Sequence, residues 1–230
     1  MTAPHKFEPF HEAIREPFDY YKFGNDFFAP LIIENESKLF GVDNAKKIKE
    51  IMAKGENVVI LSNHQTEADP QVLSLLLEKV GLGDLAEKMV FIAGHKVTND
   101  PVAIPFSMGR NLLCIHSKKH IKNPPEEAPM KMAQNLESMK AMSGLMSAAP
   151  SEPGSVFWVA PSGGRDRPGS DGEFEVPHYT TLYHTIPHYT TTIHTLYHNY
   201  THTIPQLYHN YTHTIRCRPS MPRRWTCSRS

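Results

Sequence analysis

Charged residues are missing from a long stretch of this 230-residue chain. All 24 acidic residues lie at or before Glu175, and residues 177–215 contain no charged side chain. This stretch repeats the nonapeptide Leu-Tyr-His-Asn-Tyr-Thr-His-Thr-Ile, and it shows no amphipathic period over which a core could be buried. We therefore expect residues 177–230 to be a disordered, low-complexity tail, most simply explained as a translated simple DNA repeat.

Cysteines and long apolar runs are also scarce. The three cysteines form no spaced framework, which excludes a disulfide scaffold, and Cys114 is expected to be a small core residue in a reducing compartment. No apolar run approaches the roughly 18 residues of a membrane span, so we expect a soluble protein, with peripheral association with membranes left open. The absence of a basic helix or an aromatic-interleaved basic patch argues against a nucleic acid partner.

Histidine is abundant in the tail, which holds eight of the 14 histidines of the chain. Imidazole can hold zinc, copper or nickel, but the repeat adds no carboxylate or thiol ligand. We therefore expect adventitious metal binding there and no physiological metal site.

The rest of the chain divides into a helical lead-in, residues 1–55, and a catalytic core, residues 56–176. Apolar runs bounded by turn residues predict buried strands in this core, and helical patterns separate them. The order indicates an α/β fold with a central, mostly parallel sheet flanked by helices. The predicted strands are residues 57–61, 112–116 and 156–160.

The most informative motif follows the first of these strands and reads Asn63-His64-Gln65-Thr66-Glu67-Ala68-Asp69-Pro70. Pro70 suits the first position of a helix, so His64 lies where a strand ends, the usual place for chemistry in an α/β sheet. A neutral imidazole can take a proton from a hydroxyl, and a carboxylate can orient it and stabilise the imidazolium. His64 and Asp69 are therefore candidate catalytic residues. The alternative is a surface histidine with Asp69 or Thr66 as a helix N-cap.

Basic residues follow the other two predicted strands. The second of these clusters lies on a Ser-Gly-Gly turn, where the lack of side chains lets backbone amides approach a ligand. Arginine can bind a phosphate through two parallel hydrogen bonds, and lysine acts as a point charge. The clusters together predict a phosphate pocket beside His64, although a solvated charged turn is the alternative for each. Their members are Lys118, Lys119, His120, Arg165 and Arg167.

These motifs resemble, in order, those of the glycerolipid acyltransferases, and in particular the soluble, plastid-type glycerol-3-phosphate acyltransferases. The first motif is similar to the family's His-x4-Asp signature. The resemblance runs from about Pro17 to Pro168. Its further blocks are Gly94-His95-Lys96-Val97, Pro105-Phe106-Ser107-Met108-Gly109-Arg110-Asn111-Leu112, Ser117-Lys118-Lys119-His120 and Ala160-Pro161-Ser162-Gly163-Gly164-Arg165-Asp166-Arg167-Pro168.

The resemblance implies transfer of a fatty acyl group from acyl carrier protein, or from coenzyme A, to the sn-1 hydroxyl of glycerol 3-phosphate, giving lysophosphatidic acid. It implies direct transfer by His64 and Asp69, with no metal and no organic cofactor. Lysophosphatidate is an alternative acceptor. Plastid residence is implied too, although the N-terminus shows no transit peptide. The implied glycerol 3-phosphate site consists of Lys119, His120, Arg165, Arg167 and Arg110, the last of which could instead bond inside the fold.

Residues 126–148 form a methionine-rich segment with apolar side chains near helical spacing. This spacing predicts a helix that packs those side chains into the core, and a flexible acyl channel is the alternative. The side chains are Met132, Leu136, Met139, Leu145 and Met146.

The chain also departs from the family. The family's fourth block and later strands are not visible after residue 168, and its helical N-terminal region is longer, so we expect a truncated core. His95-Lys96 stands where the family usually has an Asp-Arg pair, which puts that local ion pair in doubt. The alternatives to an active enzyme are an inactive fragment that at most binds phosphate ligands and an unfolded product of a faulty gene model.

Overall fold

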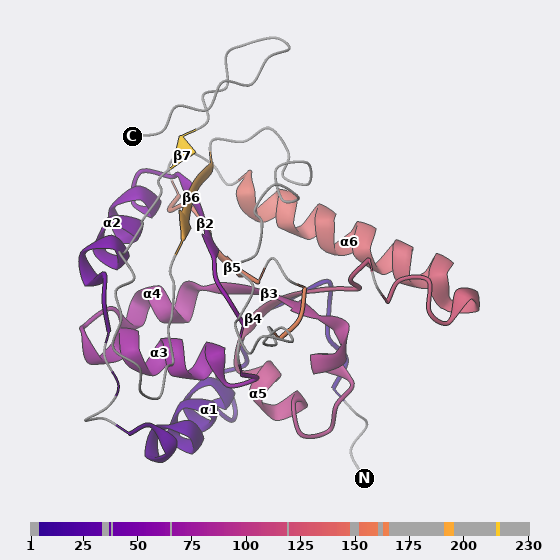
Figure 1. Ribbon diagram of the computed structural model, residues 1–230, viewed down its shortest axis with the longest axis horizontal. Helices are drawn as coiled ribbons and strands as arrows, with labels where there is room; N and C mark the ends of the chain where they lie inside the picture. The colour runs from indigo at the N-terminus through magenta and orange to yellow at the C-terminus, as the bar shows by residue number, and fades with distance from the viewer. Residues whose placement is uncertain are drawn as a thin grey trace, which may run out of the picture.

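The computed structural model describes residues 5–33, 37, 39–64, 66–118, 120–147, 152–160 and 163–165, and the backbone of two strands at residues 191–195 and 215–216. A seven-stranded sheet with the order β1-β4-β3-β5-β2-β6-β7 forms its centre (Figure 1). Strands β4, β3, β5, β2 and β6 are parallel, and β1 and β7 are antiparallel to their neighbours. The strands are β1 (Phe10–His11), β2 (Asn57–Leu61), β3 (Val90–Gly94), β4 (Asn111–Ile115), β5 (Val156–Val159), β6 (Thr191–Thr195) and β7 (Ile215–Arg216).

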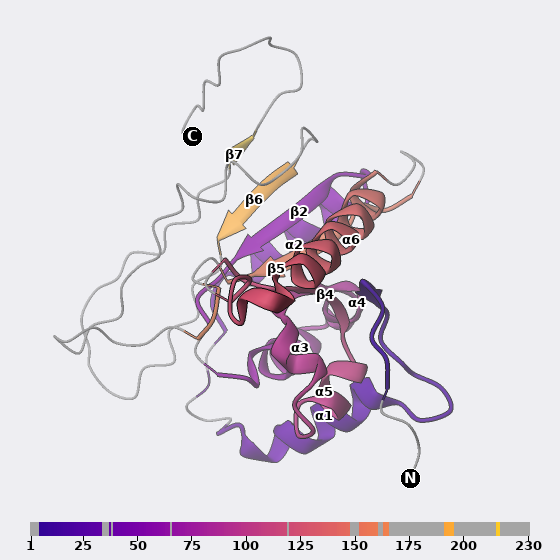
Figure 2. The same cartoon turned by 90° about the vertical axis from the view of Figure 1, so that its right-hand side faces the viewer.

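Helices cover both faces of this sheet, which confirms the α/β class (Figures 1 and 2). Helices α2, α3 and α4 pack on one face and α6 packs on the other. The helices are α1 (Tyr20–Phe28), α2 (Val42–Met52), α3 (Asp69–Lys79), α4 (Gly83–Lys88), α5 (Ile104–Met108) and α6 (Ala128–Met146), with 3-10 turns at Ala29–Leu31, His95–Thr98 and Pro125–Glu127.

Strand β2 is apolar on both sides, so both faces of the sheet must be covered by helices. Val58 and Ile60 belong to the core beneath α2, α3 and α4, whereas Val59 and Leu61 belong to the core beneath α6, as alternation along a strand requires. All five residues of β2 are buried. Cys114 lies in the first of these cores, as expected for a small apolar side chain, and burial raises the pKa of its thiol to about 12.

The register of the parallel strands brings their carboxyl ends to one edge of the sheet. Leu61 of β2 is opposite Val159 of β5, and Ile92 of β3 is opposite the same residue. The pairing of β3 with β4 ends at Gly94 and Ile115. The loops that follow these strands therefore meet, and they carry the motifs that the sequence singled out.

The expected helical lead-in contains α1 and α2, but it also contributes β1, which extends the sheet beside β4. Asp19 caps α1, since its side chain accepts a hydrogen bond from the Lys22 amide. Helix α1 approaches the core closely at Gly109, where a Cβ atom would lie 2.4 Å from the backbone of Tyr20. A glycine at this position is therefore a packing requirement.

Two short segments of the expected disordered tail are described, and both are strands. Strand β6 (Thr191–Thr195) pairs with β2 in parallel, and β7 (Ile215–Arg216) pairs with β6 in antiparallel. The first contains threonine and isoleucine, whose β-branched side chains favour strands. The expectation of disorder rested on the low complexity of the repeat and did not take this preference into account. For the rest of residues 177–230, the expectation of disorder lies outside the described residues.

Helix α6 differs from the expectation based on its methionines. Met132, Leu136 and Met139 are 60%, 53% and 44% exposed, whereas Lys131 and Ser138 are buried. Only the C-terminal end of the helix, with Met146 and Leu145, joins the core as predicted. The prediction failed because the apolar spacing in the first half of the helix defines its outer face. Within the described part of the chain, no helix is long and apolar enough to cross a membrane.

Candidate active site

His64 and Asp69 face one another across the turn between β2 and α3. Nδ1 of His64 lies 2.8 Å from Oδ2 of Asp69, and the two side chains are only 19% and 12% exposed. Oδ1 of Asp69 accepts a hydrogen bond from the backbone amide of Thr66 at 3.3 Å. The turn thus folds the carboxylate back toward the histidine.

The turn contains features of both interpretations, a histidine–carboxylate pair and helix capping. Asp69 is the first residue of α3, Pro70 follows it, and Ala68 takes the N-cap position without a side-chain cap. Oδ2 of Asp69 lies against His64, while Oδ1 accepts the Thr66 amide and Thr66 Oγ1 accepts the Ala68 amide at 3.3 Å, so the same carboxylate serves both the His64 pair and a capping contact. A carboxylate accepts hydrogen bonds, so this contact selects the tautomer with its proton on Nδ1, and in that neutral tautomer the lone pair of Nε2 could take a proton from a substrate.

Trp158 is a site residue that sequence reasoning did not single out. It lies on β5 opposite Ile60 of β2 and is 6% exposed. Its ring meets the His64 ring edge to face, with the centroids 5.9 Å apart, and its other neighbour is Phe91 at 5.7 Å. The only signal in the sequence was a large aromatic residue in a predicted central strand, two residues before the Ala160 block.

The Gly-Gly turn after β5 brings Arg165 to the same edge of the sheet. Nε of Arg165 lies 3.2 Å from Oε1 of Glu67, which belongs to the His64 turn. Gly163 adopts φ +70°, a left-handed conformation that glycine tolerates, and a Cβ built on it would lie 3.9 Å from Cβ of Ser117. The turns after β2, β4 and β5 therefore converge, as the sequence predicted. Glu67 was not predicted as a partner of Arg165.

The basic turn after β4 closes on itself. The backbone amides of His120 and Ile121 both donate to the Ser117 carbonyl at 2.9 Å. Lys118 and His120 are exposed to solvent. The predicted contributions of Lys119 and Arg167 lie outside the described residues.

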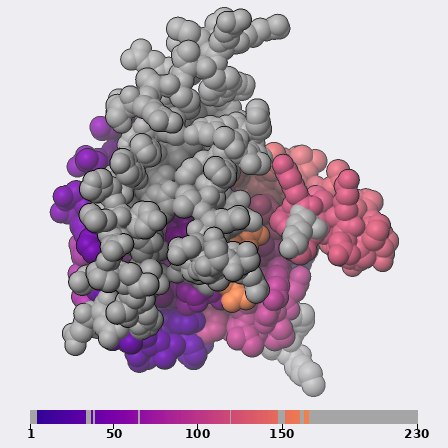
Figure 3. Space-filling model, viewed as in Figure 1, coloured from indigo at the N-terminus to yellow at the C-terminus, as the bar shows by residue number. Residues whose placement is uncertain are grey.

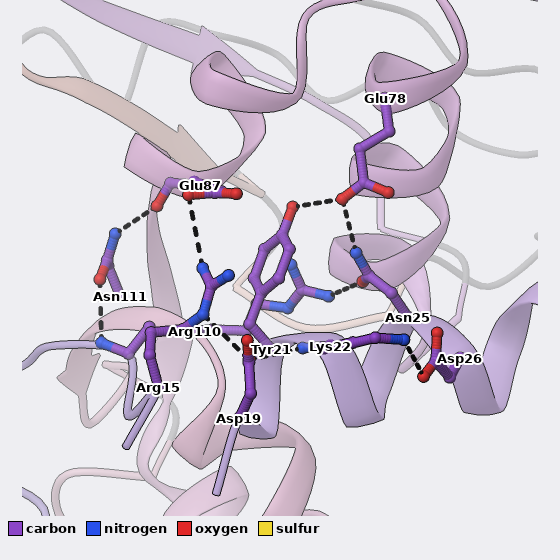
Figure 4. Close-up of polar contacts among 11 residues, drawn as sticks. Arg15, Asp19, Tyr21, Lys22, Asn25, Asp26, Glu78, Glu87, Arg110 and Asn111 are labelled. Atoms are coloured by element: carbon purple, nitrogen blue, oxygen red, sulfur yellow. Dashed lines mark hydrogen bonds and ion pairs between the residues drawn. The ribbon is translucent and has the colours of Figure 1, made fainter. Parts of the chain in front are cut away.

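Arg110 is inside the fold rather than at this edge (Figure 4). It is 3% exposed, and it donates to Asn25 Oδ1 and to Ser74 Oγ. Its guanidinium carbon lies 4.4 Å from the centroid of Tyr21, whose hydroxyl donates to Glu78. Burial lowers the pKa of Arg110 to about 10. The assignment of Arg110 to substrate binding is therefore corrected: this arginine joins β4 to α1 and α3.

His95, which stands in the place of an expected acidic residue, stacks on His116. The ring centroids are 4.3 Å apart and the planes differ by 7°. Burial, and then the nearby His116, lower the pKa of His95. Among the described residues, no group of three or more histidine, cysteine, aspartate or glutamate side chains gathers to hold a metal ion.

Comparison with known proteins identifies the family of this chain. The family model Acyltransferase matches residues 42–202. A chloroplastic glycerol-3-phosphate acyltransferase of Carthamus tinctorius is 45% identical over 168 residues, which are 73% of this chain and 35% of that protein. The corresponding protein of Spinacia oleracea is 46% identical over 73% of this chain and 34% of its own length. That of Arabidopsis thaliana is 44% identical over 76% of this chain and 37% of its own length. The chain thus spans about a third of the length of these relatives.

Proposed function

Because the chain belongs to the Acyltransferase family, we propose that it is an O-acyltransferase that acylates glycerol 3-phosphate. The observation that carries the proposal is the 2.8 Å contact between His64 Nδ1 and Asp69 Oδ2 at the carboxyl edge of a parallel sheet. The names of the relatives, which are chloroplastic glycerol-3-phosphate acyltransferases, support the choice of acceptor and a location in the plastid.

In the proposed reaction His64 is the general base. Its Nε2 takes the proton of the sn-1 hydroxyl while the hydroxyl oxygen attacks the thioester carbonyl of an acyl group carried by acyl carrier protein or coenzyme A. The C–S bond then breaks, and the imidazolium returns its proton to the leaving thiolate. Asp69 holds the Nδ1–H tautomer and stabilises the imidazolium between these two steps. The products are lysophosphatidic acid and the free thiol.

The phosphate of the acceptor is proposed to bind at the turns after β4 and β5. Arg165 and His120 are the described candidates there, and Lys119 and Arg167 remain predictions from the sequence. The ion pair of Arg165 with Glu67 is solvent-exposed, at 47% and 66% of the two side chains, so it is weak enough for a phosphate to replace the carboxylate. Binding the phosphate here would place the glycerol hydroxyls beside His64, and such positioning supplies much of the rate in a direct transfer.

An acceptor comparison tests the proposed function. The chain is incubated with palmitoyl-acyl carrier protein and either sn-glycerol 3-phosphate, glycerol or lysophosphatidate, and acylated products are measured by mass spectrometry. We expect product from glycerol 3-phosphate and none from glycerol, because glycerol lacks the phosphate that the basic turns would bind.

Two outcomes would contradict the proposal in different ways. Acylation of lysophosphatidate in preference to glycerol 3-phosphate would identify a different acceptor. Binding of glycerol 3-phosphate without any product would identify a phosphate-binding protein that is not an enzyme.

A further inference from the structure

The first half of α6 buries polar side chains. Its inward stripe consists of Lys131, Gln134, Asn135 and Ser138, and it becomes apolar only from Ala141 onward. The helix stands out at the edge of the molecule in the space-filling view (Figure 3). Burying a polar group is costly unless it is hydrogen-bonded, so the partners of this stripe explain why it is retained.

Asn135 and Ser138, in the middle of this stripe, hydrogen-bond to the backbone at the C-terminal end of β4. Asn135 Oδ1 accepts the His116 amide at 2.7 Å, and Asn135 Nδ2 donates to the His116 carbonyl at 2.9 Å. Ser138 Oγ donates to the carbonyl of Cys114 at 2.7 Å. One amide side chain therefore satisfies both backbone groups of the residue that precedes the basic turn.

Lys131, at the start of this stripe, hydrogen-bonds to the backbone at the far end of the basic turn. Lys131 is 7% exposed, and its Nζ donates to the carbonyl of Asn123 at 2.6 Å and to that of His120 at 3.3 Å. Its carboxylate partner is Glu127, 3.0 Å away and half exposed. A cation beside carbonyls at the end of a helical turn is electrostatically favourable, and burial of the ammonium strengthens the effect.

We propose that Lys131 and Asn135 are positioning residues for the acceptor phosphate. They lie four residues apart on one rigid helix and bracket the turn that presents Lys118 and His120. They contact the backbone of the turn and leave the side chains of Lys118 and His120 exposed. The inference rests on the proposed function, because it assigns the turn to the phosphate of glycerol 3-phosphate.

Lys131→Met, Lys131→Arg and Lys140→Met test the inference in the full chain. Lys140 is the matched control, since it lies on the same helix and its replacement removes the same charge, but its side chain is 62% exposed and forms an ion pair with Glu137 on the helix surface. Binding of sn-glycerol 3-phosphate is measured by calorimetry, and amide exchange is measured by NMR. The melting temperature shows whether each variant is folded.

We expect Lys131→Met to weaken binding roughly tenfold, because a displaced turn no longer presents its side chains in register. Lys131→Arg keeps the buried cation and should restore most of the affinity, and Lys140→Met should bind as wild type. The amides of His120 and Ile121 should exchange faster in Lys131→Met, while those of β4 keep wild-type protection. Asn135→Ala should release the His116 amide in the same way and weaken binding.

Wild-type affinity and wild-type exchange in Lys131→Met and Asn135→Ala would overturn the inference. Equal loss of affinity in Lys131→Met and Lys140→Met would also overturn it, because the effect would then be one of net charge. If the wild-type chain itself binds no glycerol 3-phosphate, the proposed function fails, and the exchange comparison alone decides whether these residues hold the turn.

Discussion

Trp158 contacts the imidazole that we propose as the general base, His64. The imidazole is held on one side by Asp69 at 2.8 Å and on another by the Trp158 ring at a centroid distance of 5.9 Å. Two contacts in different directions restrict the rotation of the ring.

Replacing Trp158 should therefore disturb both His64 and the packing of the sheet. In Trp158→Ala the Nδ1–H resonance of His64 should broaden or disappear in NMR spectra, because the ring gains mobility and solvent access. The substitution should also cost about 3–5 kcal/mol of unfolding free energy, since a buried indole is lost. Trp158→Phe should keep the resonance. Phe91→Leu is the control, because Phe91 packs on Trp158 at 5.7 Å without belonging to the His64 pair. An unchanged His64 signal in folded Trp158→Ala would show that Trp158 does not orient the ring.

At the scale of elements, Arg110 connects α1 and α3 to the sheet. It bonds Asn25 of α1 and Ser74 of α3, and Tyr21 of α1 lies beneath its guanidinium. Arg15 lies on the same tyrosine ring at 4.6 Å, but its side chain is 41% exposed. The two arginines therefore provide the same contact in two different environments.

This difference predicts unequal effects of two matched substitutions. Arg110→Met should lower the free energy of unfolding by about 3 kcal/mol, because it leaves buried groups of Asn25 and Ser74 without their charged donor. Arg15→Met should cost less than about 1 kcal/mol, since its ion pairs are exposed to solvent. Urea unfolding of both variants checks the prediction. Equal costs would mean that stacking on Tyr21, and not the buried hydrogen bonds, is what Arg110 contributes.

The sequence predicted the positions of β2, β4 and β5 well. It did not predict which face of α6 packs against the sheet. Residues 57–61 are β2 as predicted, and the other two runs differ from β4 and β5 by a single residue at their ends. A continuous apolar run implies a strand buried on both faces, so its signal is local. Polar side chains line the inward face of α6 because they hydrogen-bond to backbone groups of β4 and of the turn that follows it. The apolar spacing within the helix gives no indication of these distant partners.

At the scale of the whole molecule, the sheet edge assembles turns that are far apart in sequence. Convergence of the His64 turn with the Gly163 turn followed from the parallel order of the strands. The Glu67–Arg165 pair, Trp158 beside His64 and the enclosure of Arg110 did not follow, because each depends on register and packing between elements. For the same reason the motif around Arg110 does not by itself reveal that its side chain lies inside the fold.

The most direct test of the account is to measure turnover and glycerol 3-phosphate affinity together in His64→Ala. Loss of a general base should lower turnover by about 100- to 10,000-fold and leave affinity largely intact, and Asp69→Asn should do the same in milder form. Arg165→Ala, which removes a proposed phosphate contact, should show the opposite pattern, with affinity reduced about tenfold and turnover little changed. Wild-type turnover in His64→Ala, accompanied by a lower melting temperature, would show that His64 is structural and would contradict the proposed function.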